Sequence, residues 1–338
     1  TTPWGFLVRS NSREVGQLVG TGRTGELETA VVAKRRLWYI GTPARGRGRH
    51  HVAERSGRIG PSPREPTVET SRDCPLCGSA QNRRLLEQPR GDGTPGCWTL
   101  RRCAACGFVY LGERVAAADL AGRFEWRGSY AAEAARRRRE MPATAWLSQT
   151  LRRLKGAGRP DGEPRLLRVV LRHASGGRLC DFGCGEGRLL RAAAGRFEVT
   201  GIDISAPQIA VARASLPGAA LLVGPVTAQT LPRDHYDVVT LECYLEHEQD
   251  PLSALRAAFG ALRSGGLLAI KVPNYASWLR RLRGRRWCGF RYPDHCNYFT
   301  PRTLRAMVER AGFAPLAGRM SDCLPTSDNM YLAARKTG

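Results

Sequence analysis

From Pro164 onward, short apolar runs alternate with stretches in which apolar residues recur at helical spacing. The runs typical of strands lie at 178–182, 199–202, 220–223, 237–241 and 267–272. The stretches typical of helices lie at 188–195, 206–214, 251–263 and 301–311. Strand–helix alternation of this kind predicts an α/β fold, a parallel sheet with helices on both faces. The segment 161–338 is long enough to bury a sizeable core.

The first part of the chain has a different texture. Residues 1–72 show no sustained apolar periodicity, and residues 42–66 are rich in Gly and Arg and carry four prolines. This composition is typical of a poorly ordered segment. Because the chain begins at Thr1 rather than at a methionine, we expect it to be a fragment. One hypothesis for residues 1–72 is that they come from an over-extended gene model rather than a functional tail. Residues 111–160 are predicted to form a basic helical connector.

Two cysteine pairs stand at metal-ligand spacing within residues 73–110. Cys74 and Cys77 form the first CxxC pair, Cys103 and Cys106 form the second, and a glycine follows each. Each CxxC turn presents two thiolates to one ion, so the two turns predict a small ribbon around a closed, four-cysteine zinc site. With no open position, this zinc would stabilise the fold rather than catalyse. An iron site of the rubredoxin kind is the alternative, and Cys97 is not assigned to the metal.

The most informative segment is a glycine-rich turn between a strand and a helix. The strand ends in Asp181, and the turn carries Gly183, Gly185 and Gly187, which let a ligand approach the backbone. An acid before the loop suits an amine-bearing ligand better than a pyrophosphate. A second acid, Asp203, ends the next strand, where it can accept both hydroxyls of a ribose. Amine, adenosine and no phosphate describe S-adenosylmethionine; the alternative is an ordinary strand-to-helix turn.

Here the chain resembles the class I S-adenosylmethionine-dependent methyltransferases, small-molecule branch. Beyond the loop, the similar segments read LP…YDVV (231–239), LEHEQDP (245–251), LRSGG (262–266), VPN (272–274) and RYPDHCNYFTP…AGF (291–313). The resemblance implies a Rossmann-like, doubly wound, mostly parallel seven-stranded sheet preceded by the ribbon. It also implies that Asp181 and the three glycines hold the methionine part, Asp203 the ribose, and Ile204 the adenine. One departure is that Gly224 and Pro225 stand where many members have an adenine-binding acid.

Two histidines are candidates for a catalytic base. Methyl transfer to a hydroxyl needs alignment and a base, and histidine has a suitable pKa. The alternatives are that His247 orders its loop and that His295 packs within an aromatic-rich cap. Related quinone O-methyltransferases instead hold a divalent ion with an ExxEH motif. Here Cys243 stands three residues before Glu246, and Glu242 is one position off, so we do not assign a metal.

Charge changes this picture little. The net charge is +23, but 49 of the 53 basic residues are arginines, which fits a GC-rich coding bias. Local arginine clusters lie at 136–139 and 280–286, so a nucleic-acid partner is possible but not favoured. Residues 241–244 read LECY rather than the Asn/Asp-Pro-Pro-aromatic tetrad typical of base-directed N-methyltransferases.

The sequence also bears on location. It has no apolar run near the roughly 18 residues of a membrane span and no apparent secretion signal. With four cysteines in metal-type pairs, we expect a reduced, cytoplasmic protein that binds no membrane.

The sequence therefore predicts a methyltransferase that uses S-adenosylmethionine to methylate oxygen or carbon of a small molecule, such as a sugar or polyketide, and carries structural zinc. The alternative is an RNA or protein methyltransferase that binds its substrate through the ribbon and the arginine clusters. A third interpretation is a nucleic-acid-binding protein with an inactive methyltransferase domain. The sequence does not indicate the oligomeric state.

Overall fold

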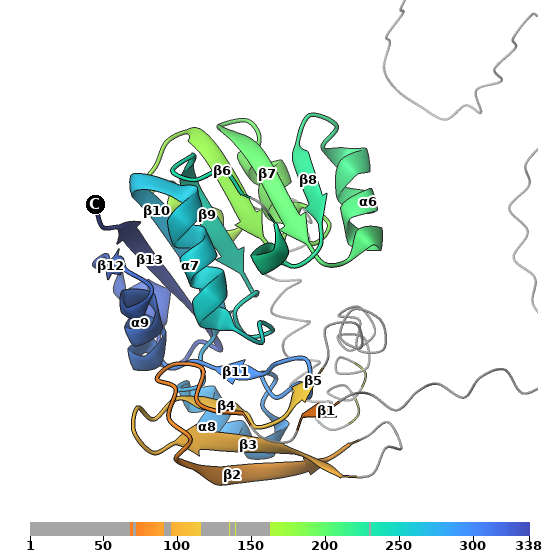
Figure 1. Ribbon diagram of the computed structural model, residues 1–338, viewed down its shortest axis with the longest axis vertical. Helices are drawn as coiled ribbons and strands as arrows, with labels where there is room; N and C mark the ends of the chain where they lie inside the picture. Colours follow the sequence, from red (N-terminus) through yellow and green to blue (C-terminus); the bar gives the residue numbers. More distant parts are fainter. Residues whose placement is uncertain are drawn as a thin grey trace, which may run out of the picture. The chain divides into compact units, whose positions relative to one another are not determined.

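The computed structural model describes residues 68–69, 72–90, 96–115, 135, 139, 163–229 and 231–338 (Figure 1). These residues belong to one compact unit. The predicted extension over 1–72, and the predicted connector over 111–160 with most of its arginine run, lie almost wholly outside the described residues. No helix of the described segments is long and apolar enough to cross a membrane.

A seven-stranded sheet forms the larger part of the described chain (Figure 1). Its strands are β6 (Gly177–Phe182), β7 (Phe197–Asp203), β8 (Ala220–Val223), β9 (Tyr236–Glu242), β10 (Leu262–Pro273), β12 (Phe313–Pro315) and β13 (Asn329–Lys336). The order is β12-β13-β10-β9-β6-β7-β8. Neighbours from β10 to β8 pair in parallel, whereas β13 is antiparallel to both β10 and β12. The prediction of a mostly parallel, seven-stranded sheet is confirmed.

Helices cover both faces of this sheet. They are α4 (Arg165–Val170), α5 (Arg188–Ala193), α6 (Ala206–Ser215), α7 (Pro251–Ala261) and α9 (Pro301–Arg310). The short helix α8 (Trp278–Arg283) lies beside the ribbon strands β2 to β4 instead (Figure 1). Short 3-10 turns lie at η1 (Val226–Ala228), η2 (Gly284–Arg286) and η3 (Met320–Cys323). Leu179 packs with α4, α5 and α6, while its neighbour Cys180 packs with α7 and α9. Successive strand residues point to opposite faces, so this alternation produces two cores and the doubly wound form.

The boundary between α7 and β10 differs from the expected one. The apolar spacing extends the helix to 263, whereas α7 ends at Ala261 and β10 begins at Leu262. Leu262 already pairs with Tyr236 of β9, and Arg263 Nε donates to Asp237 Oδ1 at 2.6 Å. The register then shifts between Leu262 and Leu267. The pairing with β9, not local helix propensity, therefore decides where the helix ends.

A four-stranded sheet carries the cysteine pairs. It contains β2 (Asn82–Pro89), β3 (Cys97–Cys103) and β4 (Val109–Leu111) in antiparallel order. The fourth strand, β11 (Asn297–Tyr298), comes from the segment between β10 and α9 and pairs with β4 (Figure 1). A further two-stranded pair joins β1 (Val68–Glu69) to β5 (Arg114–Val115). The ribbon sheet is thus completed by a strand from the far end of the sequence.

The segment that donates β11 also shares a hydrophobic core with the ribbon. Leu100 and Val109 of the ribbon pack with Trp287, Phe290 and Tyr298. Trp287 is fully buried, and its Nε1 donates to Asp328 at 2.8 Å. These three aromatic residues of the predicted cap therefore pack against the ribbon.

Candidate active site

The glycine loop between β6 and α5 folds back on the end of β7. The N–H groups of Gly183 and Cys184 donate to the carbonyl of Ile202 at 2.8 and 3.0 Å. Gly183 has φ of 74°, and a Cβ there would lie 2.6 Å from the Tyr244 ring. Gly187, with φ of 77°, is the N-cap of α5. Because other residues avoid this backbone region, the loop's close path requires glycine at these positions.

The two acids predicted to bind the cofactor lie beside this loop. Asp181 is 2% exposed, and its Oδ1 accepts from Thr240 Oγ1 at 2.6 Å. Asp203 accepts from the N–H of Gly185 through Oδ2 and from the N–H of Ser205 through Oδ1, both at 2.8 Å. The Asp203 carboxylate is therefore held in one orientation by backbone donors. Gly185, the second glycine of the motif, thereby connects the loop to the second acid.

Both acids carry raised pKa values. Burial raises the pKa of Asp181 to about 8, against the hydrogen bond from Thr240. Burial also raises the pKa of Asp203, while the N–H groups of Ser205 and Gly185 and the charge of His247 oppose the rise. Within the described residues neither acid forms an ion pair. A ligand with positive charge would stabilise both carboxylates, which fits a sulfonium that also carries an ammonium group.

The neighbouring acid at this edge of the sheet is already neutralised. Glu242 accepts from Lys271 Nζ at 2.9 Å and lies 3.8 Å from an Arg188 nitrogen. Ile204, predicted to face the adenine, is 44% exposed, an unusual state for an isoleucine beside a polar loop. No acid follows β8, where Gly224 and Pro225 lead into η1 and Val226 is buried. The two acids without ion pairs, Asp181 and Asp203, and the exposed apolar side chain of Ile204 therefore fit the predicted ligand, S-adenosylmethionine.

His247 lies in the loop after β9, near enough to Asp203 for its charge to act on the pKa of that carboxyl. Its Nδ1 lies 2.8 Å from Asp294 Oδ1, so the ring can donate there and leave Nε2 for a substrate. Burial lowers the pKa of His247, but the charge and hydrogen bond of Asp294 outweigh it, and the pKa is raised. Asp294 also pairs with Arg291, and His247 holds the pKa of Asp294 well below its usual range, although burial opposes this.

His295 packs against His247 with ring centroids 4.7 Å apart and planes at 86°. Its Nδ1 lies 2.9 Å from the carbonyl of Gly289, and its side chain is buried. Burial and the neighbouring charge of His247 place the pKa of His295 well below the usual value. The two predicted histidines are thus brought together, but only His247 is paired with a carboxylate that strengthens a base.

Glu246 is the third metal-capable group at this place. Its Oε2 is buried with no hydrogen-bond partner among the described residues. Ligand atoms of Glu246, His247 and His295 all lie within 4.8 Å of one another. The ExxEH set of the quinone enzymes is nevertheless incomplete, because Cys243 takes the first position and Glu242 is bonded to Lys271. The geometry leaves room for an ion without supplying the expected first ligand.

The four predicted metal cysteines converge. Cys74 Sγ lies 3.5 Å from Cys106 Sγ, and Cys77 Sγ lies 3.5 Å from Cys103 Sγ. All four sulfurs lie within 4.8 Å of one another, whereas Cys97 is not among them. Zn–S bonds of about 2.3 Å imply sulfurs about 3.8 Å apart in a tetrahedron, so the spacing fits a zinc ion.

Burial disfavours the thiolate form of two of these cysteines, and it raises the pKa of Cys74 well above its usual range. Burial raises the pKa of Cys106 to about 11. It would raise that of Cys103 as well, but the backbone of Cys106, the thiol of Cys77 and the backbone of Ala105 lower it to about 7. N–H groups directed at sulfur stabilise thiolates, which are the form that binds metal.

The second arginine cluster, at 280–286, is only partly free. Arg283 pairs with Asp328 at 2.8 Å, and Arg280 lies over the ring of Tyr275 at 4.3 Å. Arg281, Arg285 and Arg286 are exposed. The cluster therefore serves the packing of the segment 275–287 as well as solvation, which weakens its claim as a nucleic-acid surface.

Sequence reasoning missed two side chains that orient the site. Asp294, which orients His247, lies in the RYPDH segment, but its distance of 47 residues from His247 hid the pairing. Asn297 donates to the carbonyls of Leu245 and Glu248 at 2.8 and 2.7 Å, joining the histidine loop to β11. Asp294 and Asn297 stand among the aromatic residues of the segment 290–299, and such polar residues in an apolar segment could have indicated buried hydrogen-bond partners.

The fold and the loop geometry define a class I S-adenosylmethionine-dependent methyltransferase. A methyltransferase domain family matches residues 155–317. The chain is 37% identical over 149 residues to the ubiquinone biosynthesis O-methyltransferase of Aeromonas salmonicida. The aligned residues cover 40% of this chain and 63% of that protein. It is 32% identical over 170 residues to the enzyme of the same name from Cereibacter sphaeroides, covering 47% and 68%. The chain therefore belongs to the class I S-adenosylmethionine-dependent methyltransferases.

One solved structure illustrates the more distant similarity. An S-adenosylmethionine-dependent methyltransferase from Thermotoga maritima, described as a possible histamine N-methyltransferase, aligns at 20% identity with a TM-score of 0.42. The alignment covers 51% of this chain and 88% of that one. The chain spans a little under two thirds of the length of the Aeromonas relative. The family match begins at residue 155, so the ribbon lies outside that match.

Proposed function

We propose that the protein transfers a methyl group from S-adenosylmethionine to an oxygen, or alternatively a carbon, of a small-molecule acceptor, with His247 as the general base. The observation that carries this proposal is the Asp294–His247 pair, whose charge also acts on the cofactor acid Asp203. The O-methyltransferase names of the relatives favour oxygen over carbon. No specific contact favours an RNA or protein acceptor.

The chemistry needs little from the protein beyond alignment and one proton transfer. S-adenosylmethionine supplies a methyl carbon bonded to a sulfonium, which is a good leaving group. As the acceptor oxygen forms its bond to that carbon, the carbon–sulfur bond breaks and its electrons remain on sulfur. His247 Nε2 takes the hydroxyl proton, and Asp294 stabilises the resulting imidazolium through Nδ1. Asp181, the glycine loop and Asp203 would hold the donor in line.

Replacing Asp203 tests the assigned cofactor residues. We expect Asp203→Asn to weaken S-adenosylmethionine binding by about 10- to 100-fold, because a charge-assisted hydrogen bond contributes about 1.5–3 kcal/mol. Titration calorimetry on the purified chain measures the change. Glu198→Gln, an exposed acid on the same strand, is the matched control and should leave the affinity unchanged. Equal affinity in Asp203→Asn and the parent protein would remove Asp203 from the site.

The pH dependence tests the base. Only the unprotonated ring of His247 can accept the hydroxyl proton, and Asp294 raises the pKa of that ring above its usual value of 6.5. We therefore expect kcat to rise with pH through a pKa above 6.5 and then to level off. In Asp294→Asn the pair loses its negative charge, which lowers the pKa of His247. The rise of kcat should therefore occur at lower pH, and the maximal kcat should be smaller. If kcat of Asp294→Asn rises over the same pH range as that of the parent protein, the Asp294–His247 pair does not set the pKa of the base.

We propose further that the four cysteines hold one structural zinc ion and that the enzyme is cytoplasmic. All eleven cysteines are free thiols, which fits a reducing compartment. Elemental analysis of protein purified without added metal distinguishes zinc from the alternative, iron, which would also colour the protein. One gram-atom of zinc per chain is expected, and a stoichiometric iron content would replace zinc in this assignment.

A further inference from the structure

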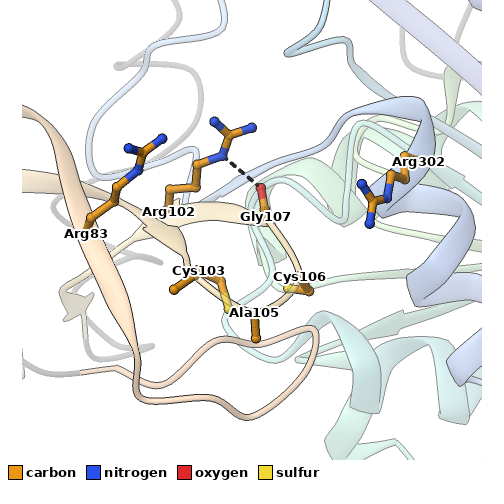
Figure 2. A pocket seen from close by; sticks show the side chains of 8 residues that line it. Arg83, Arg102, Cys103, Ala105, Cys106, Gly107 and Arg302 are labelled. Atoms are coloured by element: carbon orange, nitrogen blue, oxygen red, sulfur yellow. Dashed lines mark hydrogen bonds between the residues drawn. The ribbon is translucent and has the colours of Figure 1, made fainter.

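Three arginines from two distant parts of the chain surround one cavity, which has a volume of about 480 Å³. Arg83 lies on β2, Arg102 lies on β3, and Arg302 lies in the first turn of α9. Figure 2 shows the side chains of Arg83 and Arg102 on one side and that of Arg302 across from them, with the second cysteine turn between. The cavity is of the size that small ligands occupy in proteins.

The charges around this cavity are unbalanced. Arg83, Arg102 and Arg302 are exposed, and none of the three forms an ion pair with a described carboxylate. Neighbouring arginines behave differently: Arg84 pairs with Glu87, and Arg305 pairs with Glu309. The described lining contains no Asp or Glu. No described carboxylate offsets these three positive charges, and an anion bound in the hollow would do so.

The position of Arg302 strengthens this reading. It stands in the first turn of α9, a ten-residue helix with no acid in that turn. The start of a helix carries a partial positive charge, so a cation there is unfavourable and an anion is favourable. Arg102 is oriented as well, since its Nε donates to the carbonyl of Gly107 at 3.5 Å (Figure 2). The capping box of Thr300 and Thr303 already satisfies the N–H of Thr303 at this helix start, so the guanidinium groups, not the helix, are the donors that face the cavity.

We propose that this cavity binds the phosphate group of a small molecule. Arginine presents paired donors that match phosphate oxygens, and three such forks surround the hollow. A concave site of this volume suits a compact phosphate or diphosphate better than an extended nucleic-acid backbone. The site is separate from the cofactor acids and does not depend on the proposed methyl acceptor.

Inorganic pyrophosphate is the probe for this site. Titration calorimetry on the full-length, zinc-containing protein at constant ionic strength should detect saturable binding. Arg102→Gln and Arg302→Gln are each expected to weaken it by about 10-fold or more. Arg310→Gln, an exposed arginine at the other end of α9, is the matched control and should leave it unchanged. Because Arg302 lies outside the ribbon, its variant separates the site from ribbon folding.

Two other results would overturn the proposal. The arginines could balance the net negative charge of a zinc ion with four thiolates; in that case the variants would lose zinc content, and pyrophosphate would not bind to the parent protein. A nucleic-acid surface would instead show duplex DNA binding more tightly than pyrophosphate and losing affinity in Arg310→Gln as well. Pyrophosphate binding that is equal in all variants would place the anion elsewhere.

Discussion

His247→Ala is expected to lower kcat by about 10²- to 10⁴-fold while the affinity for S-adenosylmethionine stays within about twofold of the parent. The loss follows from removing the proposed proton acceptor, the histidine whose Nδ1 is held by Asp294. The affinity is expected to stay because the residues proposed to hold the cofactor are Asp181, the glycine loop and Asp203, which this substitution leaves in place. Single-turnover rates and calorimetry, on one preparation, measure both quantities.

His295→Ala provides the comparison at the same place. Its ring is buried against Gly289 and His247, so its loss should lower stability and affect kcat less than His247→Ala does. The reverse ranking, with His295→Ala the more damaging to kcat in folded protein, would make His295 the base.

Divalent ions form the remaining comparison. We expect methyl transfer to be independent of added Mg²⁺ or Mn²⁺, because the motif lacks its first carboxylate. Activity that needs such an ion, and that Glu246→Gln abolishes, would establish the metal-assisted route instead.

Cys77→Ser is expected to release the zinc and unfold the ribbon. Structural zinc contributes apparent binding free energies on the order of 10 kcal/mol in small domains, so losing one thiolate should remove most of the ribbon's stability. The loss should extend to catalysis, because β11 pairs with β4 of the ribbon and lies next to His295 in sequence. Zinc content, thermal unfolding and kcat measured together check the prediction.

Cys97→Ser is the matched control for this experiment. Cys97 is half-buried like Cys77, and its sulfur is outside the group of four. It should keep full zinc content and nearly full activity. A zinc-free Cys77→Ser protein with normal kcat would mean that the segment 291–298 holds its shape without the ribbon.

The sequence could predict those parts of the site that are formed by residues close together in the chain. The glycine loop, Asp181 and the CxxC turns each need a local backbone form or a fixed ligand spacing, and both leave a pattern within a few positions. The partners Thr240 and Asp294 could not be predicted, because each contact depends on how strands or loops pair across 59 and 47 residues. The pairing of β11 with β4 depends on register between segments almost 200 residues apart.

That pairing has a consequence for how the protein can be divided. A chain beginning at residue 161 would keep every motif of the methyltransferase family, yet it would present the backbone edge of Asn297 and Tyr298 without a partner. It would also open the apolar sides of Trp287 and Phe290 to water. Unpaired edges with exposed aromatics promote association between copies. The smallest independently stable piece is therefore larger than the family domain, and its border runs through the ribbon's sheet rather than between two modules.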